Sequence, residues 1–144
     1  ADGLRLAVDE MTQRIGDTEF DAIVGLESRG FLFGMPMAYN LHKAFIPIRK
    51  RGKLPRETAH ISYELEYGSA EIEVHKEDIT PGMRVVVVDD LIATGGTLEA
   101  AVQLLEGLGA KVVKVVCLLE LKGLHGRDKL KGYPLETVVA YDGK

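Results

Sequence analysis

One stretch of the sequence, residues 85–101, constrains the fold more than any other. It begins with four consecutive valines, an apolar run typical of a strand that is buried on both faces in a parallel sheet. Two aspartates follow, Asp89 and Asp90, before a segment with helical periodicity. The small residues between the strand and this helix are Ala93, Thr94, Gly95, Gly96 and Thr97. This order predicts an α/β unit with a ligand site at the end of its strand.

The rest of the chain alternates between segments with strand and with helix patterns. Strands are predicted at residues 20–26, 44–48, 112–119 and 135–140, and helices at residues 4–15, 31–41, 98–105 and 122–130. This order favours an α/β fold with a mostly parallel central sheet flanked by helices, in one domain of residues 1–144. The carboxyl ends of parallel strands share one edge of a sheet. We therefore expect the loops at residues 27–30, 49–53 and 89–97 to meet there.

Residues 57–77 interrupt this alternation with a different pattern. Apolar and polar residues alternate over residues 61–67 and 70–74, on both sides of Gly68 and Ser69. Alternation with a period of two is typical of half-exposed strands, so the pattern predicts a β-hairpin with a two-residue turn. We expect this hairpin to form an arm or mobile flap outside the main sheet.

Composition and charge restrict the function classes that remain open. The chain has 144 residues, of which 46% are hydrophobic; this suffices for a packed core and is not typical of a disordered protein. The formal net charge of −4 argues against a dedicated nucleic-acid binder. The single cysteine, Cys117, favours a reducing compartment, and no apolar run reaches membrane-spanning length. We therefore expect a cytoplasmic protein without a membrane or nucleic-acid partner.

The segment at residues 93–97 has the features of a phosphate site. Glycines let a backbone approach a phosphate closely, the N–H groups of a helix start point toward it, and threonine hydroxyls add donors. A tight turn capped by Thr94 or Thr97 would explain the glycine pair equally well. The adjacent carboxylates favour the phosphate site, because Asp89 and Asp90 could accept hydrogen bonds from ribose hydroxyls, near enough to a phosphate for Mg²⁺ to be useful. The alternative for this pair is an exposed acidic surface before a helix.

Together these features resemble the phosphoribosyl-diphosphate motif of the type I phosphoribosyltransferases. Three further blocks resemble the adenine phosphoribosyltransferases within that superfamily. In chain order they are Glu27-Ser28-Arg29-Gly30-Phe31, Arg49-Lys50-Arg51-Gly52-Lys53-Leu54-Pro55 and Tyr63-Glu64-Leu65-Glu66-Tyr67-Gly68. The resemblance implies the type I phosphoribosyltransferase fold with a β-hairpin flap. It also implies purine salvage, in which adenine and 5-phosphoribosyl 1-diphosphate give AMP and diphosphate with Mg²⁺, usually in a homodimer.

The resemblance assigns the phosphoribosyl half of the site to residues already singled out. Residues 93–97 would cradle the 5′-phosphate, and Asp89 and Asp90 would hold the ribose hydroxyls. The diphosphate would be bound by Glu27, Ser28, Arg29, Arg49, Lys50 and Lys53. In the family, the loop formed by the first three of these often contains a cis peptide bond. Fixed cations beside a leaving diphosphate stabilise the charge that develops on it. Without the resemblance, the basic residues would be a solvated strand end or a nucleic-acid patch, and the net negative charge and the lack of interleaved aromatic residues argue against the patch.

The remaining assignments concern the base and rest on the resemblance alone. Glu66 would be the catalytic residue that handles a proton of the base, with Tyr67 beside it on the closing hairpin. Leu121 would pack on the adenine ring. From the residues themselves, Glu66 is an exposed strand residue and Leu121 an ordinary core leucine. The four histidines form no ligand-like grouping, so we expect no protein-bound structural metal.

The chain departs from the family at its start and leaves two other functions open. The family carries an upstream hood segment, with a Phe-Arg-Asp stretch, that covers the base. This sequence contains nothing like it, so we expect either a truncated sequence or a protein without the segment, and base specificity rests on the resemblance. One alternative is a phosphoribosyltransferase for another purine, such as xanthine. The other is a non-catalytic regulator that binds 5-phosphoribosyl 1-diphosphate. The block at residues 63–68, which contains Glu66, argues for the adenine enzyme.

Overall fold

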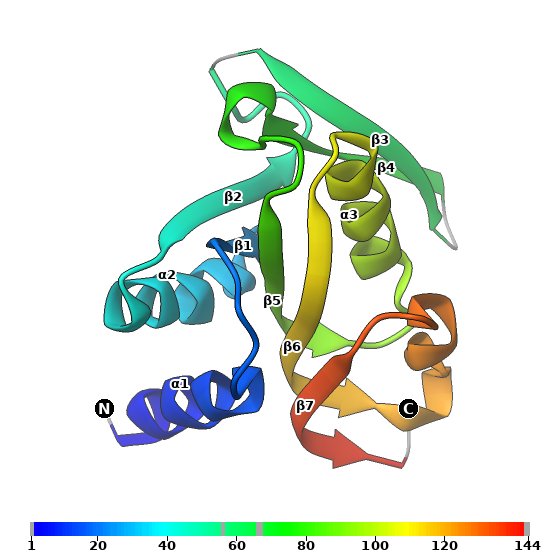
Figure 1. Ribbon diagram of the computed structural model, residues 1–144. Helices are drawn as coiled ribbons and strands as arrows, with labels where there is room; N and C mark the ends of the chain where they lie inside the picture. Colours follow the sequence, from blue (N-terminus) through cyan, green and yellow to red (C-terminus); the bar gives the residue numbers. More distant parts are fainter. Residues whose placement is uncertain (1, 56, 66–67, 143–144) are drawn as a thin grey trace.

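The computed structural model describes residues 2–55, 57–65 and 68–142, which form one seven-stranded sheet with helices on both faces (Figure 1). The elements are α1 (Asp2–Ile15), β1 (Ala22–Leu26), α2 (Arg29–Leu41), β2 (Ala44–Lys50), β3 (Thr58–Leu65), β4 (Gly68–His75), η1 (Lys76–Asp78), β5 (Arg84–Ile92), α3 (Gly96–Gly107), β6 (Lys111–Leu121), η2 (Lys122–Leu124), η3 (Gly126–Leu130) and β7 (Leu135–Tyr141). The strand order is β3-β4-β2-β1-β5-β6-β7. Strands β2, β1, β5, β6 and β7 are parallel, and β4 runs antiparallel to both β2 and β3. The α/β class and the mostly parallel sheet predicted from the sequence are confirmed.

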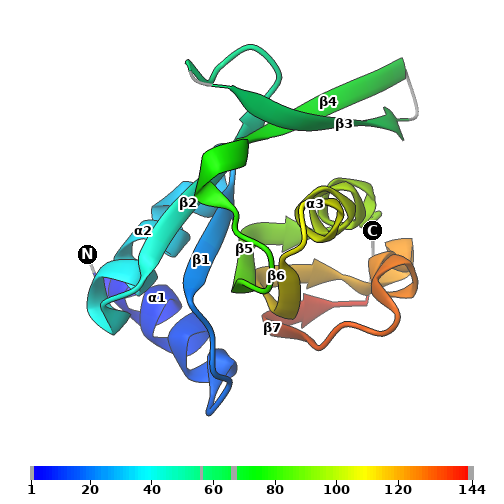
Figure 2. The same ribbon diagram turned by 45° about the horizontal axis from the view of Figure 1, so that its top comes forward.

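The central strand β5 explains the layered core. Its valines are fully buried, and successive side chains point to opposite faces of the sheet. Val85 and Val87 pack into the apolar cluster that includes α3, whereas Val86 and Val88 pack into the cluster with α1 and α2. Figure 2 shows these helices on the two sides of the sheet. No helix in the described part of the chain combines the length and apolar character needed to cross a bilayer.

Strand β5 continues past the aspartates that the sequence placed at its end. It runs to Ile92, so Asp89 and Asp90 lie within the strand. The reason is that Asp89, Leu91 and Ile92 still pair with β6. The acidic pair thus lies near the carboxyl end of β5. This end shares one edge of the sheet with the carboxyl ends of β1, β2 and β6.

The hairpin β3–β4 is part of the sheet, so the prediction of an arm outside it is wrong. Arg49 and Lys50 at the end of β2 pair with β4, and the hairpin then crosses over α3 (Figure 2). Its register also differs from the prediction, because Gly68 and Ser69 lie in β4 and do not form the turn. Leu65 pairs with Gly68, so the ladder ends two residues earlier in the chain than predicted. The shift is even, so it keeps Ile72 on the buried face, and alternation alone could not distinguish the two registers.

The segment at residues 122–130 was predicted as one short helix and instead forms η2 and η3. His125 separates them in the left-handed conformation, with φ of 57°. Glycines at positions 123 and 126 weaken a continuous helix. This break places η3 beside the start of α3.

Candidate active site

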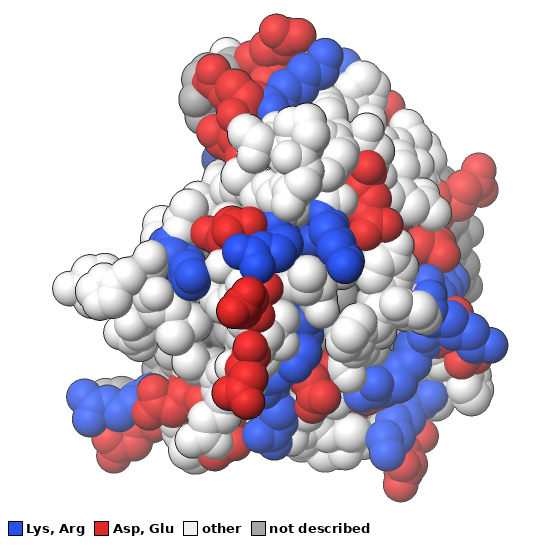
Figure 3. All heavy atoms as spheres, in the orientation of Figure 1, with Lys and Arg blue, Asp and Glu red and all other residues white. Residues whose placement is uncertain are grey.

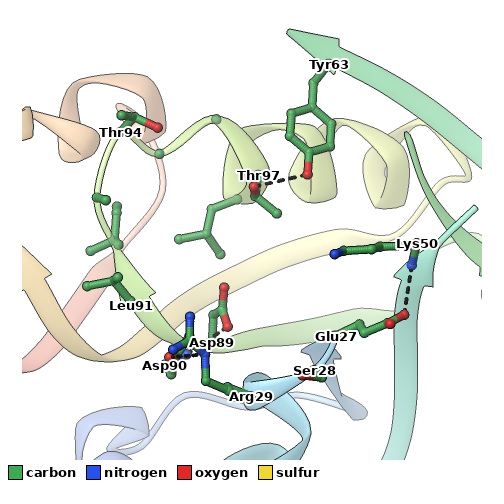
Figure 4. A pocket seen from close by; sticks show the side chains of 15 residues that line it. Glu27, Ser28, Arg29, Lys50, Tyr63, Asp89, Asp90, Leu91, Thr94 and Thr97 are labelled. Atoms are coloured by element: carbon green, nitrogen blue, oxygen red, sulfur yellow. Dashed lines mark hydrogen bonds and ion pairs between the residues drawn. The ribbon is translucent and has the colours of Figure 1, made fainter. Parts of the chain in front are cut away.

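A cavity of about 370 Å³ lies at the carboxyl edge of the sheet, between β5, the start of α3 and the hairpin (Figure 4). It is lined by Glu27, Ser28, Arg29, Lys50, Tyr63 and residues 89–98. The residues that follow β1, end β2 and follow β5 therefore meet, as expected for strand ends in a parallel sheet. Most of the residues singled out from the sequence line this one cavity.

The loop between β5 and α3 forms one end of the cavity. Gly95 has φ of 85°, a left-handed conformation that favours glycine. A Cβ atom there would lie 2.6 Å from the carbonyl oxygen of Gly126, so close packing against η3 also requires glycine. The first residues of α3, Gly96 and Thr97, line the cavity and place the positive end of the helix at its wall. This arrangement can bind an anion through backbone N–H groups.

The acidic pair forms the floor of the cavity beside α2. Asp89 Oδ1 accepts a hydrogen bond from the backbone N–H of Asp90 at 2.8 Å, and Arg29 Nε lies 3.0 Å from Asp90 Oδ2. Burial of Asp89, together with the neighbouring carboxylate, raises the pKa of Asp89 to about 8. Near neutral pH the pair therefore carries less than two negative charges, which reduces its repulsion of a phosphorylated ligand.

Gly30 explains how α2 comes so close to this floor. A Cβ atom on Gly30 would lie 2.9 Å from the carbonyl oxygen of Val88 and 3.2 Å from Asp89 Oδ1. Only glycine lets the start of the helix rest against the end of β5 at this distance. The position next to it, Arg29, is thereby held beside Asp90.

The loop after β1 forms the wall of the cavity across from the β5–α3 loop (Figure 4). The peptide bond between Glu27 and Ser28 is cis, as the resemblance implied. Glu27 Oε1 accepts hydrogen bonds from Arg49 Nε at 3.0 Å and from the backbone N–H of Lys50 at 2.9 Å. Burial alone would raise the pKa of Glu27, but these hydrogen bonds and the positive charges of both partners hold it below its usual range. Glu27 thus remains anionic and ties the end of β2 to this loop.

The basic residues after β2 are placed differently from one another. Lys50 lines the cavity, and its side chain extends into it (Figure 4). Arg49 is engaged with Glu27, and Lys53 is exposed; neither lines the cavity. Leu121 ends β6 at the same edge of the sheet, where Glu120 beside it pairs with Ile92, but it too is outside the lining.

The proposed catalytic pair, Glu66 and Tyr67, lies outside the described residues. The hairpin instead contributes Tyr63, which reaches from β3 toward the start of α3 (Figure 4). The Thr97 hydroxyl donates a hydrogen bond to the Tyr63 hydroxyl at 3.2 Å. This contact joins the hairpin to the loop that was assigned to the phosphate.

Sequence reasoning gave no site role to four residues of the lining: Tyr63, Leu91, Ile92 and Leu98. For Tyr63 a signal was available, because alternation puts it on the same face of β3 as Ile61, which packs against the core beneath the hairpin. Leu91 and Ile92 lack such a signal, since they look like a simple continuation of a buried strand.

The comparisons with known proteins agree with this geometry. The family model for the phosphoribosyl transferase domain matches residues 3–140. The adenine phosphoribosyltransferase of Lachnoclostridium phytofermentans is 59% identical over 143 residues, which are 99% of this chain and 82% of the relative. That of Agathobacter rectalis is 59% identical over 144 residues, 100% of this chain and 83% of the relative.

Solved structures give the same result. The adenine phosphoribosyltransferase of Thermoanaerobacter pseudethanolicus superposes with a TM-score of 0.95 at 44% identity, over 97% of this chain and 81% of the other. The Saccharomyces cerevisiae enzyme, solved with adenine and an imino-altritol bisphosphate, has a TM-score of 0.87 at 42% identity, over 94% of this chain and 78% of the other. The chain therefore belongs to the phosphoribosyl transferase family, among the adenine phosphoribosyltransferases.

Proposed function

We propose that this chain transfers the 5-phosphoribosyl group of 5-phosphoribosyl 1-diphosphate to adenine, giving AMP and diphosphate. The observation that carries the proposal is the single cavity in which the β5–α3 loop, the acidic pair and the cis loop after β1 meet. These groups suit the 5′-phosphate, the ribose hydroxyls and the diphosphate of one substrate. The adenine assignment follows the relatives, which carry that activity in their names.

In this reaction the bond between C1′ of the ribose and the diphosphate oxygen breaks, and its electron pair leaves with the diphosphate. A bond forms between C1′ and N9 of adenine, and the base loses a proton. Positive charge develops on the ribose and negative charge on the leaving group, so fixed cations at the diphosphate lower the barrier. Lys50 and Arg29 line the cavity and are the candidates for this role.

The ribose 5-phosphate would stay in place while these bonds change. Gly95, Gly96 and Thr97 offer backbone N–H groups and a hydroxyl to the phosphate. Asp89 and Asp90 would accept hydrogen bonds from the ribose hydroxyls. This division leaves the anchoring of the sugar to β5 and α3.

The residues present fit a Mg²⁺ ion whose ligands would come mainly from the diphosphate of the substrate. No cluster of three potential ligands was found among the described residues, but Asp89 and Asp90 face the cavity. Mg²⁺ commonly binds through one or two carboxylates together with phosphate oxygens and water. When bound, the ion would neutralise charge on the diphosphate.

The base would be handled from the hairpin and from β6. Glu66 is the proposed proton-handling residue, with Tyr67 beside it, and Leu121 would pack on the adenine ring. The hairpin at residues 57–77 is proposed to act as a mobile flap that closes over the base, which excludes water and limits hydrolysis of the diphosphate. Arg49 and Lys53 would support the diphosphate from outside the cavity lining.

We further propose that the protein acts as a homodimer on small-molecule substrates. Leu32, Met35 and Tyr39 of α2 are 60%, 53% and 81% exposed and recur at a spacing that puts them on one helical face. On the face drawn in Figure 3, basic and acidic side chains are interspersed, unlike the basic surface of a nucleic-acid binder. Sedimentation analysis of the wild type and of Tyr39→Glu tests the dimer, because a charge on this face should shift the protein toward monomer.

One assay separates the proposed function from its alternatives. Diphosphate release is measured with Mg²⁺, 5-phosphoribosyl 1-diphosphate, and adenine, hypoxanthine, xanthine or no base. We expect release with adenine to exceed release with the other bases. A preference for xanthine or hypoxanthine would indicate a different purine enzyme, and binding of the substrate without turnover of any base would indicate a regulator.

A further inference from the structure

We propose that Glu73, on strand β4, is a positioning residue. It holds the backbone of the basic loop at residues 51–54 and thereby fixes the positions of the lysines that would bind the diphosphate. The inference rests on the proposed function, because it concerns the diphosphate half of that site. Glu73 is far from the sugar and phosphate residues in the sequence. It lies on the hairpin, whose assigned role is at the base.

The contacts of Glu73 are directed at the loop backbone. Glu73 is buried, with 2% of the residue exposed. Its Oε1 accepts hydrogen bonds from the N–H groups of Gly52 and Lys53, each at 3.1 Å, and of Leu54 at 2.9 Å. Its Oε2 accepts one from the Thr58 hydroxyl at 3.1 Å. Three successive N–H groups that converge on one oxygen form the kind of concavity that binds an anion, here filled by the protein's own carboxylate.

The charge state of Glu73 agrees with this role. Burial alone would raise the pKa of Glu73, but the hydrogen bonds from Leu54, Thr58, Gly52 and Lys53 hold it below its usual range. Arg51 Nε lies 4.0 Å from the carboxylate and adds a positive charge. A buried carboxylate that is ionised and hydrogen-bonded is costly to replace, since an amide oxygen accepts weaker hydrogen bonds from the same donors and an apolar side chain accepts none.

The loop that Glu73 holds is continuous with the cavity. Lys50 lines the cavity and pairs with Ile72 in the β2–β4 ladder, one residue from Glu73. Lys53, whose N–H group is bound by Glu73, is the other family-matched lysine. Release of the loop would move Lys53 directly and would remove the support next to Lys50, whose carbonyl oxygen accepts a hydrogen bond from the Lys53 N–H group at 3.3 Å. The β5–α3 loop would not be affected.

Glu71 offers a matched control on the same strand. Residues two apart on a strand share a face, so Glu71 and Glu73 both point toward the basic loop. The Glu71 side chain, however, is 40% exposed and meets the side chains of Arg51 at 3.1 Å and Ser62 at 3.2 Å. Among the described residues, the Glu71 carboxylate accepts no hydrogen bond from the loop amides, and the one from the Arg51 N–H group goes to the backbone carbonyl of Glu71. Glu71→Gln therefore removes a nearby charge without releasing the backbone.

The test compares the wild type with Glu73→Gln, Glu73→Asp and Glu71→Gln. Titration with inorganic diphosphate and Mg²⁺ gives the affinity of the diphosphate half, and steady-state kinetics give KM for both substrates. We expect Glu73→Gln to weaken diphosphate binding and raise KM for 5-phosphoribosyl 1-diphosphate about tenfold, with KM for adenine nearly unchanged. Glu73→Asp should fall between Glu73→Gln and the wild type, and Glu71→Gln should behave as the wild type.

A folded Glu73→Gln variant with wild-type diphosphate affinity would overturn the proposal. So would an equal rise of KM for both substrates, which indicates a general structural role. If Glu73→Gln does not fold, amide exchange in the wild type decides: the proposal requires the amides of Gly52, Lys53 and Leu54 to exchange slowly, and exchange as fast as in an exposed loop refutes it. Absence of adenine turnover in the wild type would refute the proposed function alone, since the diphosphate titration would still test Glu73.

Discussion

The two sides of the cavity are built in different ways. On the phosphate side, residues 89–97 are contiguous, and the site is shaped by backbone: a strand end, a left-handed glycine and a helix start. On the hairpin side, contacts join residues far apart in the sequence: Leu54 and Glu73 are separated by 19 positions, and Tyr63 and Thr97 by 34. A site shaped by local backbone can be read from a short motif, whereas one assembled by side chains requires the tertiary fold.

The two sides of the cavity also differ in their proposed roles in the reaction. The sugar phosphate does not change during the reaction, and it would be held by the β5–α3 side. The groups that do change are the base and the leaving diphosphate, which would be met by the hairpin and by the basic loop beside it. Variants of the residues assigned to the sugar phosphate should therefore fail in substrate binding, whereas variants of the proposed proton-handling residue on the hairpin should fail in turnover.

The largest effect is expected on the hairpin side, from Glu66→Ala. Loss of a group that handles a proton typically costs ~10²–10⁴-fold in rate, so kcat should fall by at least ~10²-fold. KM for 5-phosphoribosyl 1-diphosphate should change little, because the phosphate side is intact. Steady-state kinetics check this, with Glu64→Ala as the control on an exposed residue of the same hairpin. Near-normal turnover in Glu66→Ala would remove Glu66 from the mechanism.

On the phosphate side, Gly95→Ala should impair substrate binding more than turnover. The new Cβ would meet the Gly126 carbonyl oxygen at 2.6 Å, and the left-handed φ of 85° is unfavourable for alanine. A shift of the loop by about 1 Å can cost about 10²-fold, here expected mainly as a higher KM for 5-phosphoribosyl 1-diphosphate. Gly107→Ala is the matched control, because a Cβ atom there meets no atom within 4 Å. Equal kinetics for the two alanine variants would show that the loop does not set substrate binding.

The phosphate side could be predicted from the sequence because each of its parts has a local cause. The valine run predicted a buried strand, and the glycines after it predicted a close backbone approach at a helix start. Even here the end of β5 was placed too early, since its last residues pair with β6 and this pairing depends on a partner strand. The cis bond at Glu27 could be expected only from the resemblance, because nothing in the local residue types requires it.

The hairpin side was predicted less well, for a physical reason. Alternation predicted two strands, but β4 pairs with β2, and no local pattern determines which strand an edge will join. Glu73 looked like one of several polar residues on an exposed face. Its burial results from the loop at residues 51–54 folding over it, which is a tertiary event.

A smaller effect should reveal how far the two sides are coupled. Tyr63→Phe removes only the hydroxyl that accepts the hydrogen bond from Thr97. A neutral hydrogen bond contributes about 0.5–1.5 kcal/mol, so kcat/KM for 5-phosphoribosyl 1-diphosphate should fall about 2- to 10-fold. In the background of Thr97→Val, which also lacks the bond, Tyr63→Phe should have no further effect. Additive losses in this double-mutant cycle would mean that the sides act independently.

The last effect concerns the acidic pair and changes the stability of the free protein, not catalysis. The pKa of Asp89 is raised from its ordinary value of 3.8 to about 8 by burial and by Asp90, so between these values the folded state binds a proton that the unfolded state has lost. The contribution of this group to stability is therefore fully present below about pH 4 and decreases as pH rises to about 8. Thermal unfolding without Mg²⁺ at pH 5 and pH 8 should show a fall of about ten degrees for the wild type that Asp89→Asn lacks. Asn keeps an oxygen for the Asp90 N–H group but cannot ionise, so equal falls in both proteins would mean that Asp89 is already ionised at pH 5 and that the phosphate side tolerates two full charges.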